Sequence, residues 1–370
     1  MRIGLVELYE RNHYSLIVNW LLVCRENGWD CTLYATNEIL ANVAREISGF
    51  AYDVVAFDGI SLGALREIRA DSIRRGCFLV FLSLSGSYWR HLFCSFAGAP
   101  HALTVHNAYA WMGRGVLRKP WYLFKKFLRW KMRRAADAIV VNSDPMAKAM
   151  EGAGKPVFVM PFSLLRTPGA RTARGASLTI VCPGKIEAGR KRYEDFLRLA
   201  ADFPEHKFAL LGKPAADPRS RAVYEAAGAL PNVARFDRYL SVEEFRAGML
   251  EADLLFSDIV VEYDNSDYHE VYGVSKDSGF SYLMAEYGLP GIVNAGFRNL
   301  DYLDCGTFYF RDYAELRSII LKAAERGVIE GRKASIARAV AEHGPERYAR
   351  SLAGLEAIAS RGLPGKAGRV

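Results

Sequence analysis

The first feature of this 370-residue sequence that could do chemistry is a cluster of cations directly after an apolar segment. Gly184 ends that segment, and Lys185, Arg190 and Lys191 follow within the next seven residues. Arginine and lysine side chains placed in this way can neutralise a diphosphate. A solvated helix start is the alternative, but cations at a helix N-terminus are unfavourable unless an anion offsets them. The cluster therefore predicts a loop that binds a polyanion.

A second cluster, in residues 272–293, combines a small polar turn with the start of an apolar helical segment. Lys276 is followed by Asp277, Ser278 and Gly279. A helix N-terminus offers unpaired backbone N–H groups and partial positive charge, the serine adds a hydroxyl, and the glycine lets a ligand approach closely. Phosphate would fit such a site, although an ordinary helix cap by Asp277 or Ser278 would produce much of the same pattern.

Strand-like and helical segments alternate along the chain, which is the pattern of parallel sheets covered by helices. Strands are predicted at residues 3–8, 31–35, 54–57, 78–82, 102–105, 138–141 and 157–160, and then at 178–182, 208–211, 233–236, 254–256, 291–293 and 307–310. We therefore predict an α/β fold with two Rossmann-like, doubly wound domains (1–165 and 177–344), a polar linker (166–176) and a C-terminal helix (345–370) that packs back on the first domain. Because ligands bind beyond the carboxyl ends of such strands, the two clusters are expected to face a shared cleft.

Composition and motifs exclude several classes of protein. No segment approaches the roughly 20 apolar residues that span a bilayer. The first residues predict a strand instead of the apolar core of a signal peptide, which favours the cytoplasm. The six cysteines are scattered without a CxxC pair, so neither a disulfide framework nor a structural zinc site is predicted. GxGxxG is missing after the first strand of either domain and GxxxxGK[ST] is missing throughout, which disfavours dehydrogenases and P-loop enzymes.

The net charge of +8 is concentrated in one part of the chain. No acidic residue occurs between Asp71 and Asp137, where basic residues alternate with aromatic ones. The pattern fits a solvated basic helix, an anionic membrane surface or nucleic acid. A helical stripe that includes Trp121 and Met132 is more typical of a core. The preferred membrane contacts are therefore in the preceding loop, at Trp111, Arg114, Arg118 and Lys119.

Several segments, taken in order, resemble GT-B fold glycosyltransferases, in particular those of family 4. In the second half they are PGKIEAGRKRYEDFLRLA, KFALLGKP, SVEEFRAGMLEADLLFSD and KDSGFSYLMAEYGLPGIV, which resemble the nucleotide-binding domain. In the first half, LTVHNAY and ADAIVVNSDPMAKAM resemble the family's histidine-bearing loop and its later strand with a following serine. The resemblance covers nearly the whole chain and implies two Rossmann-like domains that face a cleft.

By this resemblance the two clusters become two sides of a donor site. The implied ligands of the donor diphosphate are Lys185, Arg190, Lys191, Lys276, Ser278 and Gly279. The implied nucleobase contact is the backbone of the segment formed by Arg238, Tyr239 and Leu240. Family-4 enzymes commonly carry two glutamates eight residues apart, and here Ser275 and Leu283 stand in their places. The chain is in this respect nearer to relatives with a Ser-Gly helix start, and the donor sugar stays open.

Two histidines have the implied catalytic roles. His106 matches the family's histidine near the donor sugar, and His13 lies in the loop where inverting enzymes of this fold place a general base. A histidine there could accept the proton of an acceptor hydroxyl near neutral pH, and Glu7 and Glu10 are other candidates. Retaining members lack such a base, and the likeness to family 4 slightly favours retention.

We therefore expect a glycosyltransferase that moves a sugar from a nucleoside diphosphate sugar to a hydroxyl of a glycan, glycolipid or lipid-linked acceptor, with Asn12 and Asn107 at the acceptor or sugar. Neither a cofactor, a metal nor a nucleic-acid partner is expected, and a peripheral contact with the inner face of an anionic membrane stays open. One alternative is a nucleotide-sugar 2-epimerase, which shares the fold and a DSG motif like that at Asp277. The other is a basic module that binds nucleic acid or lipid.

Overall fold

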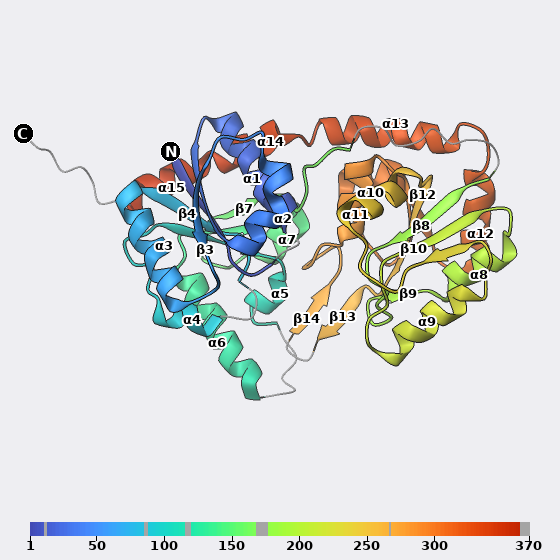
Figure 1. Ribbon diagram of the computed structural model, residues 1–370, viewed down its shortest axis with the longest axis horizontal. Helices are drawn as coiled ribbons and strands as arrows, with labels where there is room; N and C mark the ends of the chain where they lie inside the picture. Colours follow the sequence, from blue (N-terminus) through green and yellow to red (C-terminus); the bar gives the residue numbers. More distant parts are fainter. Residues whose placement is uncertain (11–12, 85–87, 115–119, 168–176, 266–267, 363–370) are drawn as a thin grey trace, which may run out of the picture.

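The computed structural model describes residues 1–10, 13–84, 88–114, 120–167, 177–265 and 268–362. Two parallel β-sheets with helices on both faces lie side by side and form two domains (Figure 1). The fold class predicted from the alternating pattern is therefore confirmed. None of the helices in these ranges is both long and apolar enough to cross a bilayer.

The N-terminal domain contains one parallel sheet with the strand order β3-β2-β1-β4-β5-β6-β7. Its strands are β1 (Arg2–Glu7), β2 (Asp30–Thr36), β3 (Asp53–Phe57), β4 (Cys77–Phe81), β5 (His101–Val105), β6 (Ala138–Val141) and β7 (Val157–Val159). Its helices are α1 (Tyr14–Asn27), α2 (Asn37–Ile47), α3 (Leu62–Arg75), α4 (Tyr88–Phe93), α5 (Ala108–Trp111), α6 (Pro120–Ala135) and α7 (Asp144–Ala149).

The C-terminal domain repeats the plan with the order β11-β10-β8-β12-β15-β16, and β9 pairs antiparallel with β12. Its strands are β8 (Thr179–Pro183), β9 (Lys191–Arg192), β10 (Lys207–Leu211), β11 (Val233–Arg235), β12 (Leu254–Ile259), β15 (Gly291–Asn294) and β16 (Thr307–Phe310). Its helices are α8 (Glu194–Asp202), α9 (Pro218–Gly228), α10 (Val242–Leu250), α11 (Gly279–Tyr287), η1 (Asp301–Gly306), α12 (Tyr313–Ala323) and α13 (Val328–Ala341).

Local sequence explains where these elements start and why they pack. Central strands such as β4, with the sequence CFLVF, are buried at every residue, as expected for parallel strands covered on both faces. Helices begin at small polar residues that accept a backbone N–H, for example Thr36, Ser61 and Asp217. Each sheet therefore has an apolar core on both faces.

A hairpin of β13 (Glu262–Asn265) and β14 (Tyr268–Val271) lies between the domains, next to α5 (Figure 1). The sequence pattern favours a solvated acidic loop here. Instead, Glu270 is buried, and its carboxylate accepts a hydrogen bond of 2.9 Å from the backbone N–H of Ala110. The hairpin therefore bridges the two domains.

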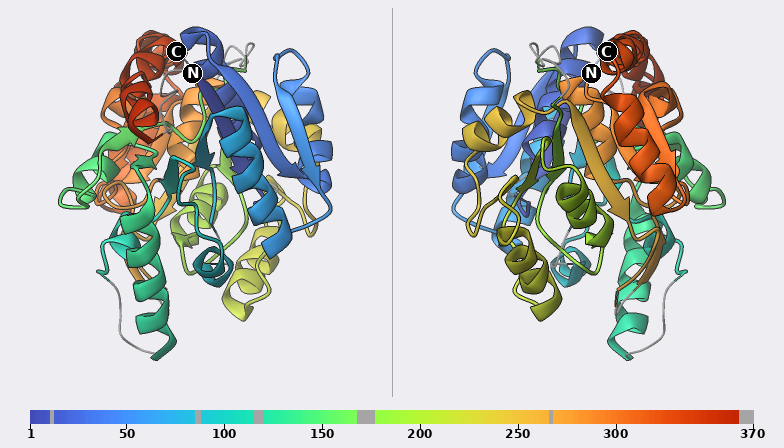
Figure 2. Two further views of the ribbon diagram at one scale, coloured as in Figure 1. Left: turned by 90° about the vertical axis from the view of Figure 1, so that its left-hand side faces the viewer. Right: turned by 90° about the vertical axis from the view of Figure 1, so that its right-hand side faces the viewer.

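The C-terminal segment returns to the first domain. Figures 1 and 2 show α13 lying along the second domain, and α14 (Pro345–Leu352) and α15 (Gly354–Gly362) lying along the first. Tyr348, Leu352 and Leu355 join the core around α1. The sequence predicts one helix here, whereas the chain forms two. Residues 168–176 of the predicted linker and the last eight residues, 363–370, lie outside the described ranges.

Candidate functional site

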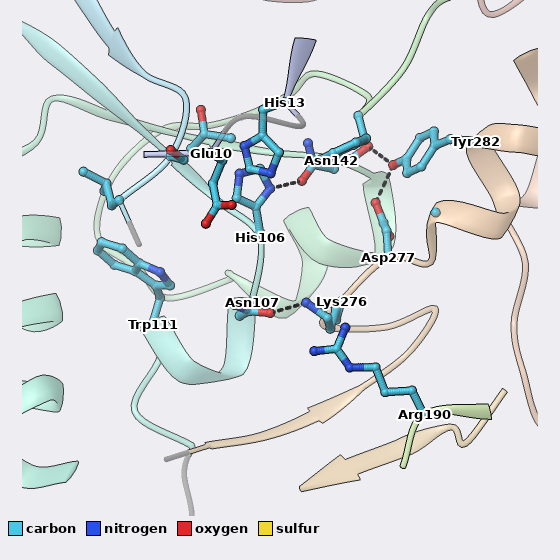
Figure 3. Close-up of a pocket in the computed structure, with 15 residues that line it drawn as sticks. Glu10, His13, His106, Asn107, Trp111, Asn142, Arg190, Lys276, Asp277 and Tyr282 are labelled. Carbon is cyan, nitrogen blue, oxygen red and sulfur yellow. Dashed lines mark hydrogen bonds between the residues drawn. The ribbon is translucent and has the colours of Figure 1, made fainter. Parts of the chain in front are cut away.

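Two adjoining cavities lie between the domains, at the carboxyl ends of the central strands. The larger, of about 450 Å³, contains residues that follow β1, β4, β5 and β6. The smaller, of about 360 Å³, is lined by residues that follow β8, by the last residue of β12 and by residues around the start of α11. Arg190, Lys276, Asp277 and Gly279 line both cavities. Figure 3 shows the first three of them in the larger cavity. The cleft therefore lies where ligands of doubly wound sheets bind.

The basic loop after β8 forms one wall of the smaller cavity. Gly184 has φ of +87°, a conformation that favours glycine, and it turns the chain away from the strand. Lys185 is exposed at the cavity, and the ammonium of Lys191 donates a hydrogen bond of 2.6 Å to the carbonyl of Pro183. The guanidinium of Arg190 lies 5.0 Å from the ring centre of Tyr263 in the hairpin. The loop therefore presents three cations beside one strand end.

The N-terminus of α11 forms the opposite wall. The hydroxyl of Ser278 accepts a hydrogen bond of 3.3 Å from the backbone N–H of Phe280, so this serine caps the helix. A Cβ atom at Gly279 would meet nothing within 4 Å. The capping role and the predicted phosphate-binding role are compatible, because capping occupies one N–H group and leaves open space beside the glycine.

Lys276 and Asp277, directly before α11, reach across to the first domain. The ammonium of Lys276 donates to Oδ1 of Asn107 over 2.6 Å, and Asp277 accepts from the hydroxyl of Ser143 over 2.7 Å. Burial, together with the nearby Arg190, lowers the pKa of Lys276 to about 8, whereas burial raises the pKa of Asp277. The segment before α11 is therefore hydrogen-bonded to the other domain.

Sequence reasoning missed two members of this network. The hydroxyl of Tyr282 lies within hydrogen-bonding distance of two oxygens, 2.5 Å from Asp277 and 2.9 Å from the carbonyl of Asn142. The Asn142 side chain in turn reaches His106. The sequence offered no spacing signal for them, because Asp277 lies before α11, Tyr282 lies within it five residues later, and Asn142 belongs to the other domain.

His106 has both ring nitrogens engaged by oxygen atoms of the protein. Nδ1 lies 2.8 Å from Oδ1 of Asn142, and Nε2 lies 2.9 Å from the carbonyl of Leu82. The amide of Asn142 donates to the carbonyl of Met160, which fixes its orientation. Burial lowers the pKa of His106 to about 4, so the ring is neutral at physiological pH and can donate to only one of the two oxygens. His106 is thus a positioned ring in the cavity wall.

His13 lies beside His106, with 5.1 Å between the ring centres (Figure 3). Its Nδ1 is 3.4 Å from Oε2 of Glu7, a carboxylate with no exposed surface. The other carboxylate oxygen of Glu7 accepts from the backbone N–H groups of Tyr9 and Glu10. The backbone therefore fixes the Glu7 carboxylate beside the His13 ring, which lines the larger cavity.

The remaining predicted site residues fall in different places. Asn107 lines the larger cavity. Trp111 is also in that wall and only 6% exposed, so the predicted membrane contact is wrong for this side chain, because its ring packs in the domain core. The guanidinium of Arg114 lies over the ring of Tyr109. Asn12, Arg118 and Lys119 lie outside the described residues.

The three predicted nucleobase contacts do not line either cavity. Arg238 makes hydrogen bonds of 2.8 and 2.5 Å to the carboxylate of Glu244, and Tyr239 stacks under the ammonium of Lys213, 3.9 Å from its ring centre. Leu240 packs against the core beside α11. These side chains are thus engaged elsewhere in the C-terminal domain.

The two positions where family-4 enzymes have glutamates are also resolved. Ser275 is buried, and its carbonyl accepts from the backbone N–H of Ala108 in the other domain. Leu283 lines the smaller cavity. Glu286, the next acidic residue, lies 3.4 Å from the hydroxyl of Ser163 and does not line that cavity. A carboxylate is therefore not available to a ribose at these positions.

Within the described ranges, no three His, Cys, Asp or Glu side chains are grouped so that they could hold a metal ion. The carboxylates that line the cavities, those of Glu10, Glu187 and Asp277, are accompanied there by cations, amides and histidines.

No protein-family model and no curated protein sequence matches this chain. Solved structures do match. HepE from Anabaena, in complex with UDP and glucose, is 13% identical with a TM-score of 0.63, over 96% of this chain and 99% of that one. The pneumococcal O-GlcNAc transferase GtfA, with UDP and GlcNAc, is 8% identical with a TM-score of 0.65, over 99% of both chains. A glycosyltransferase from Rickettsia africae is 11% identical with a TM-score of 0.61, over 99% of both. These likenesses confirm the GT-B fold.

Proposed function

We propose that this protein is a glycosyltransferase that moves a sugar from a nucleoside diphosphate sugar to an acceptor hydroxyl. The observation that carries the proposal is the joined pair of cavities, one lined by cations and a helix N-terminus and the other by two histidines. A diphosphate in the smaller cavity would direct its sugar past Arg190 and Lys276 into the larger one. The HepE structures, which hold UDP, UDP and glucose, or UDP-glucose, support this assignment.

In this proposal the protein accelerates transfer in two ways. The cleft holds donor and acceptor together, which removes the entropic cost of their encounter. Lys185, Arg190 and the N-terminus of α11 stabilise the negative charge that develops on the leaving diphosphate. Because the chain supplies these charges itself, we propose a reaction that is independent of a metal ion.

We propose an acceptor in cell-surface glycan or glycolipid assembly, on the cytoplasmic face of a membrane. The support is the stretch between Asp71 and Asp137, which has basic and aromatic residues and no acidic ones. An enzyme that meets a lipid-linked acceptor would benefit from such a surface.

The resemblance to family 4 supports retention of the anomeric configuration, with the donor phosphate taking the acceptor's proton. One contact favours inversion as a second candidate, namely the 3.4 Å approach of His13 to Glu7. The anomeric configuration of the product, determined by NMR, separates the two. With retention, His13→Gln is expected to lower kcat by less than about tenfold, whereas loss of a general base would lower it by roughly 10²–10⁴-fold.

The test of the donor site is a thermal-shift screen of nucleoside diphosphate sugars, followed by titration calorimetry with UDP. Lys185→Ala and Ser278→Ala should each weaken UDP binding, by about tenfold or more for the lysine. Lys207→Ala is the matched control, because this exposed lysine is the first residue of β10 and lies at the end of the strand away from the cleft. Unchanged affinity in both site variants would refute the assignment.

Two measurements separate the transferase from its two alternatives, namely incubation of the enzyme with the donor alone and the thermal-shift screen. A nucleotide-sugar 2-epimerase would convert the donor without an acceptor, and that result would exclude the transferase. A basic module without a donor site would show no thermal shift with any nucleotide sugar, while it would bind nucleic acid with a steep salt dependence.

A further inference from the structure

A third cavity lies within the N-terminal domain, outside the cleft. Its volume is about 500 Å³, which exceeds the volume of the larger cleft cavity. It lies between the sheet, α6 and the segment 94–100 that follows α4, and Figure 1 shows these two helices next to one another. None of the described residues that line it also lines a cavity of the cleft. A cavity of this size can hold a small molecule.

Aromatic rings form much of the wall of this third cavity. The ring of Phe81 meets three other rings edge-on, with 5.4, 5.0 and 6.0 Å between the ring centres, and these rings belong to His91, Phe96 and His101. Leu103 and Met132 line the cavity beside them and are buried. Because aromatic rings pack favourably edge-to-face with one another, this wall favours a ring over an alkyl chain.

His101 adds a hydrogen-bond acceptor to this apolar wall. Its Nδ1 lies 3.0 Å from the carbonyl oxygen of Ala99, and since a carbonyl can only accept, Nδ1 carries the proton. Burial lowers the pKa of His101, so the ring is neutral near pH 7 and its Nε2 is an acceptor. A molecule in the cavity would therefore gain from one O–H or N–H group.

The two fully charged side chains that line the cavity have opposite signs. Lys131 is exposed on α6, and the carboxylate of Asp137 accepts a hydrogen bond of 2.9 Å from the backbone N–H of His101. The other titratable rings are neutral, since burial also lowers the pKa of His91 to about 4. The described lining therefore has no excess of either charge, and it matches a neutral molecule.

Hydrogen bonds hold the segment 94–100 over the cavity. The guanidinium of Arg69 in α3 donates two of them, of 2.8 and 3.2 Å, to the carbonyl of Ala97. The backbone N–H of Ala99 donates to the carbonyl of Phe96 over 2.9 Å, and the carbonyl of Pro100 accepts from Leu79 in β4 over 2.9 Å. The cavity is therefore preformed by the backbone, as is usual for sites that bind small molecules.

We propose that this third cavity binds a neutral aromatic molecule of one or two fused rings that carries a single O–H or N–H donor. The rings of Phe81 and Phe96 would pack against it, and Nε2 of His101 would accept from its donor group. A nucleoside diphosphate is a poorer ligand, because its charges would meet one lysine and one carboxylate. This site is independent of the donor reaction proposed above.

The experiment follows the fluorescence of 2-naphthol as it is titrated with the full chain. The matched ligand is 2-methoxynaphthalene, which has the same rings and no donor. We expect one saturable site for 2-naphthol and at least fivefold weaker binding of the methoxy compound, because one hydrogen bond is lost. His101→Phe keeps a ring and removes the acceptor, so it should bind the two ligands with equal affinity.

A second variant tests the location of the ligand. Ala135 is an exposed residue at the end of α6 that lines the cavity, and Ala135→Phe should weaken the binding of both ligands at least tenfold by filling the space. Ala222→Phe, at an exposed alanine of α9 in the other domain, is the matched control and should bind like the original chain. Thermal unfolding shows whether each variant is folded.

Four results would overturn the proposal. The first is the lack of saturable binding of 2-naphthol. The second is equal affinity of the original chain for the two ligands, which would mean that no acceptor is used. The third is equal binding of 2-naphthol by Ala135→Phe and Ala222→Phe. The fourth is displacement of 2-naphthol by UDP, which would place the ligand in the cleft. A thermal shift with UDP tests the donor site separately, so either proposal can fail without the other.

Discussion

The two walls of the cleft have the same architectural origin and opposite chemistry. Both consist of loops after the central strands of doubly wound sheets. The C-terminal wall presents positive charge. Lys185 and Arg190 follow a glycine turn, and the helix start at Gly279 has open space beside it. Apart from the carboxylate of Glu10, the N-terminal wall presents mainly uncharged groups, such as His106 and Asn142, whose polar atoms are bonded within the protein.

This difference indicates a division of labour between two copies of one fold. A wall of cations and unpaired backbone N–H groups stabilises charge on a ligand. A wall of neutral side chains with fixed orientation can shape and orient a ligand without holding a charge. The contact of Lys276 with Asn107 joins the two walls, so donor binding and closure of the cleft are expected to influence one another.

The largest effect is expected from removing a charge on the C-terminal wall. Arg190→Ala should weaken UDP binding by roughly 100-fold, because a charge-assisted contact to phosphate is lost. Arg192→Ala is the matched control, since this arginine lies 3.3 Å from Asp258 and lines neither cavity of the cleft. Calorimetry with UDP measures both. Similar losses in the two variants would mean that the cations act by general attraction and not by contact.

The second prediction concerns the pH dependence of the same wall. The pKa of Lys276 is lowered to about 8, so its ammonium is present below that pH and lost above it. UDP affinity should therefore be constant near pH 7 and fall by up to about tenfold per pH unit above 8. Lys276→Arg should remove this fall, because arginine stays charged. Identical profiles for the two proteins, measured by calorimetry between about pH 7 and 9.5, would contradict the assignment.

The third prediction tests the neutrality of the N-terminal wall. Folding lowers the pKa of His106 from 6.5 to about 4, so the unfolded chain binds a proton at a pH where the folded chain does not. His106 therefore costs no stability above pH 6.5, where it is neutral in both states, and the folded chain loses about 3 kcal/mol of stability as the pH falls from 6.5 to below 4. His106→Gln should have a flatter stability profile in urea over this window. An unchanged slope would show that the ring is not held neutral.

The smallest effect is expected from a methyl group at the helix start. Gly279→Ala should fold normally, since a Cβ atom there meets nothing, and should weaken UDP binding by about fivefold because the methyl occupies the space for phosphate. Gly288→Ala, at the other end of α11, is the control. Its φ of +63° disfavours alanine, so it should lower thermal stability, at a cost of about 1 kcal/mol, and leave UDP affinity unchanged. Unchanged UDP affinity in Gly279→Ala, together with weaker UDP binding in Gly288→Ala, would contradict a phosphate site at this helix start.

Much of the fold could be predicted because parallel strands have a local signature. The predicted strands at 138–141 and 307–310 have the same bounds as β6 and β16. Buried strands are continuous apolar segments, and helices begin at capping residues that can be read directly. The hairpin β13–β14 was missed, because its acidic residues are typical of solvent. Glu262 and Asp264 are exposed, and only the contact with Ala110 of the other domain explains why Glu270 is buried.

The site was predicted in part for a similar reason. The position of a cation or glycine relative to a strand end or helix start can be read from the neighbouring residues. Lys185, Arg190 and Gly279 could therefore be named from the sequence, and they line one cavity. The burial of Trp111 could not be predicted, because it depends on core side chains from distant parts of the chain.

By itself, the sequence determined two sheets of parallel strands, a basic loop after one strand and a glycine at the start of one helix, because these depend on residues close together in the chain. Only the tertiary structure decided that Asp277 contacts Ser143, that His13 approaches Glu7 and that Phe96 and His101 line a separate cavity. The physical reason is that burial and long-range hydrogen bonds set protonation and exposure, and they depend on which surfaces the two domains bring together.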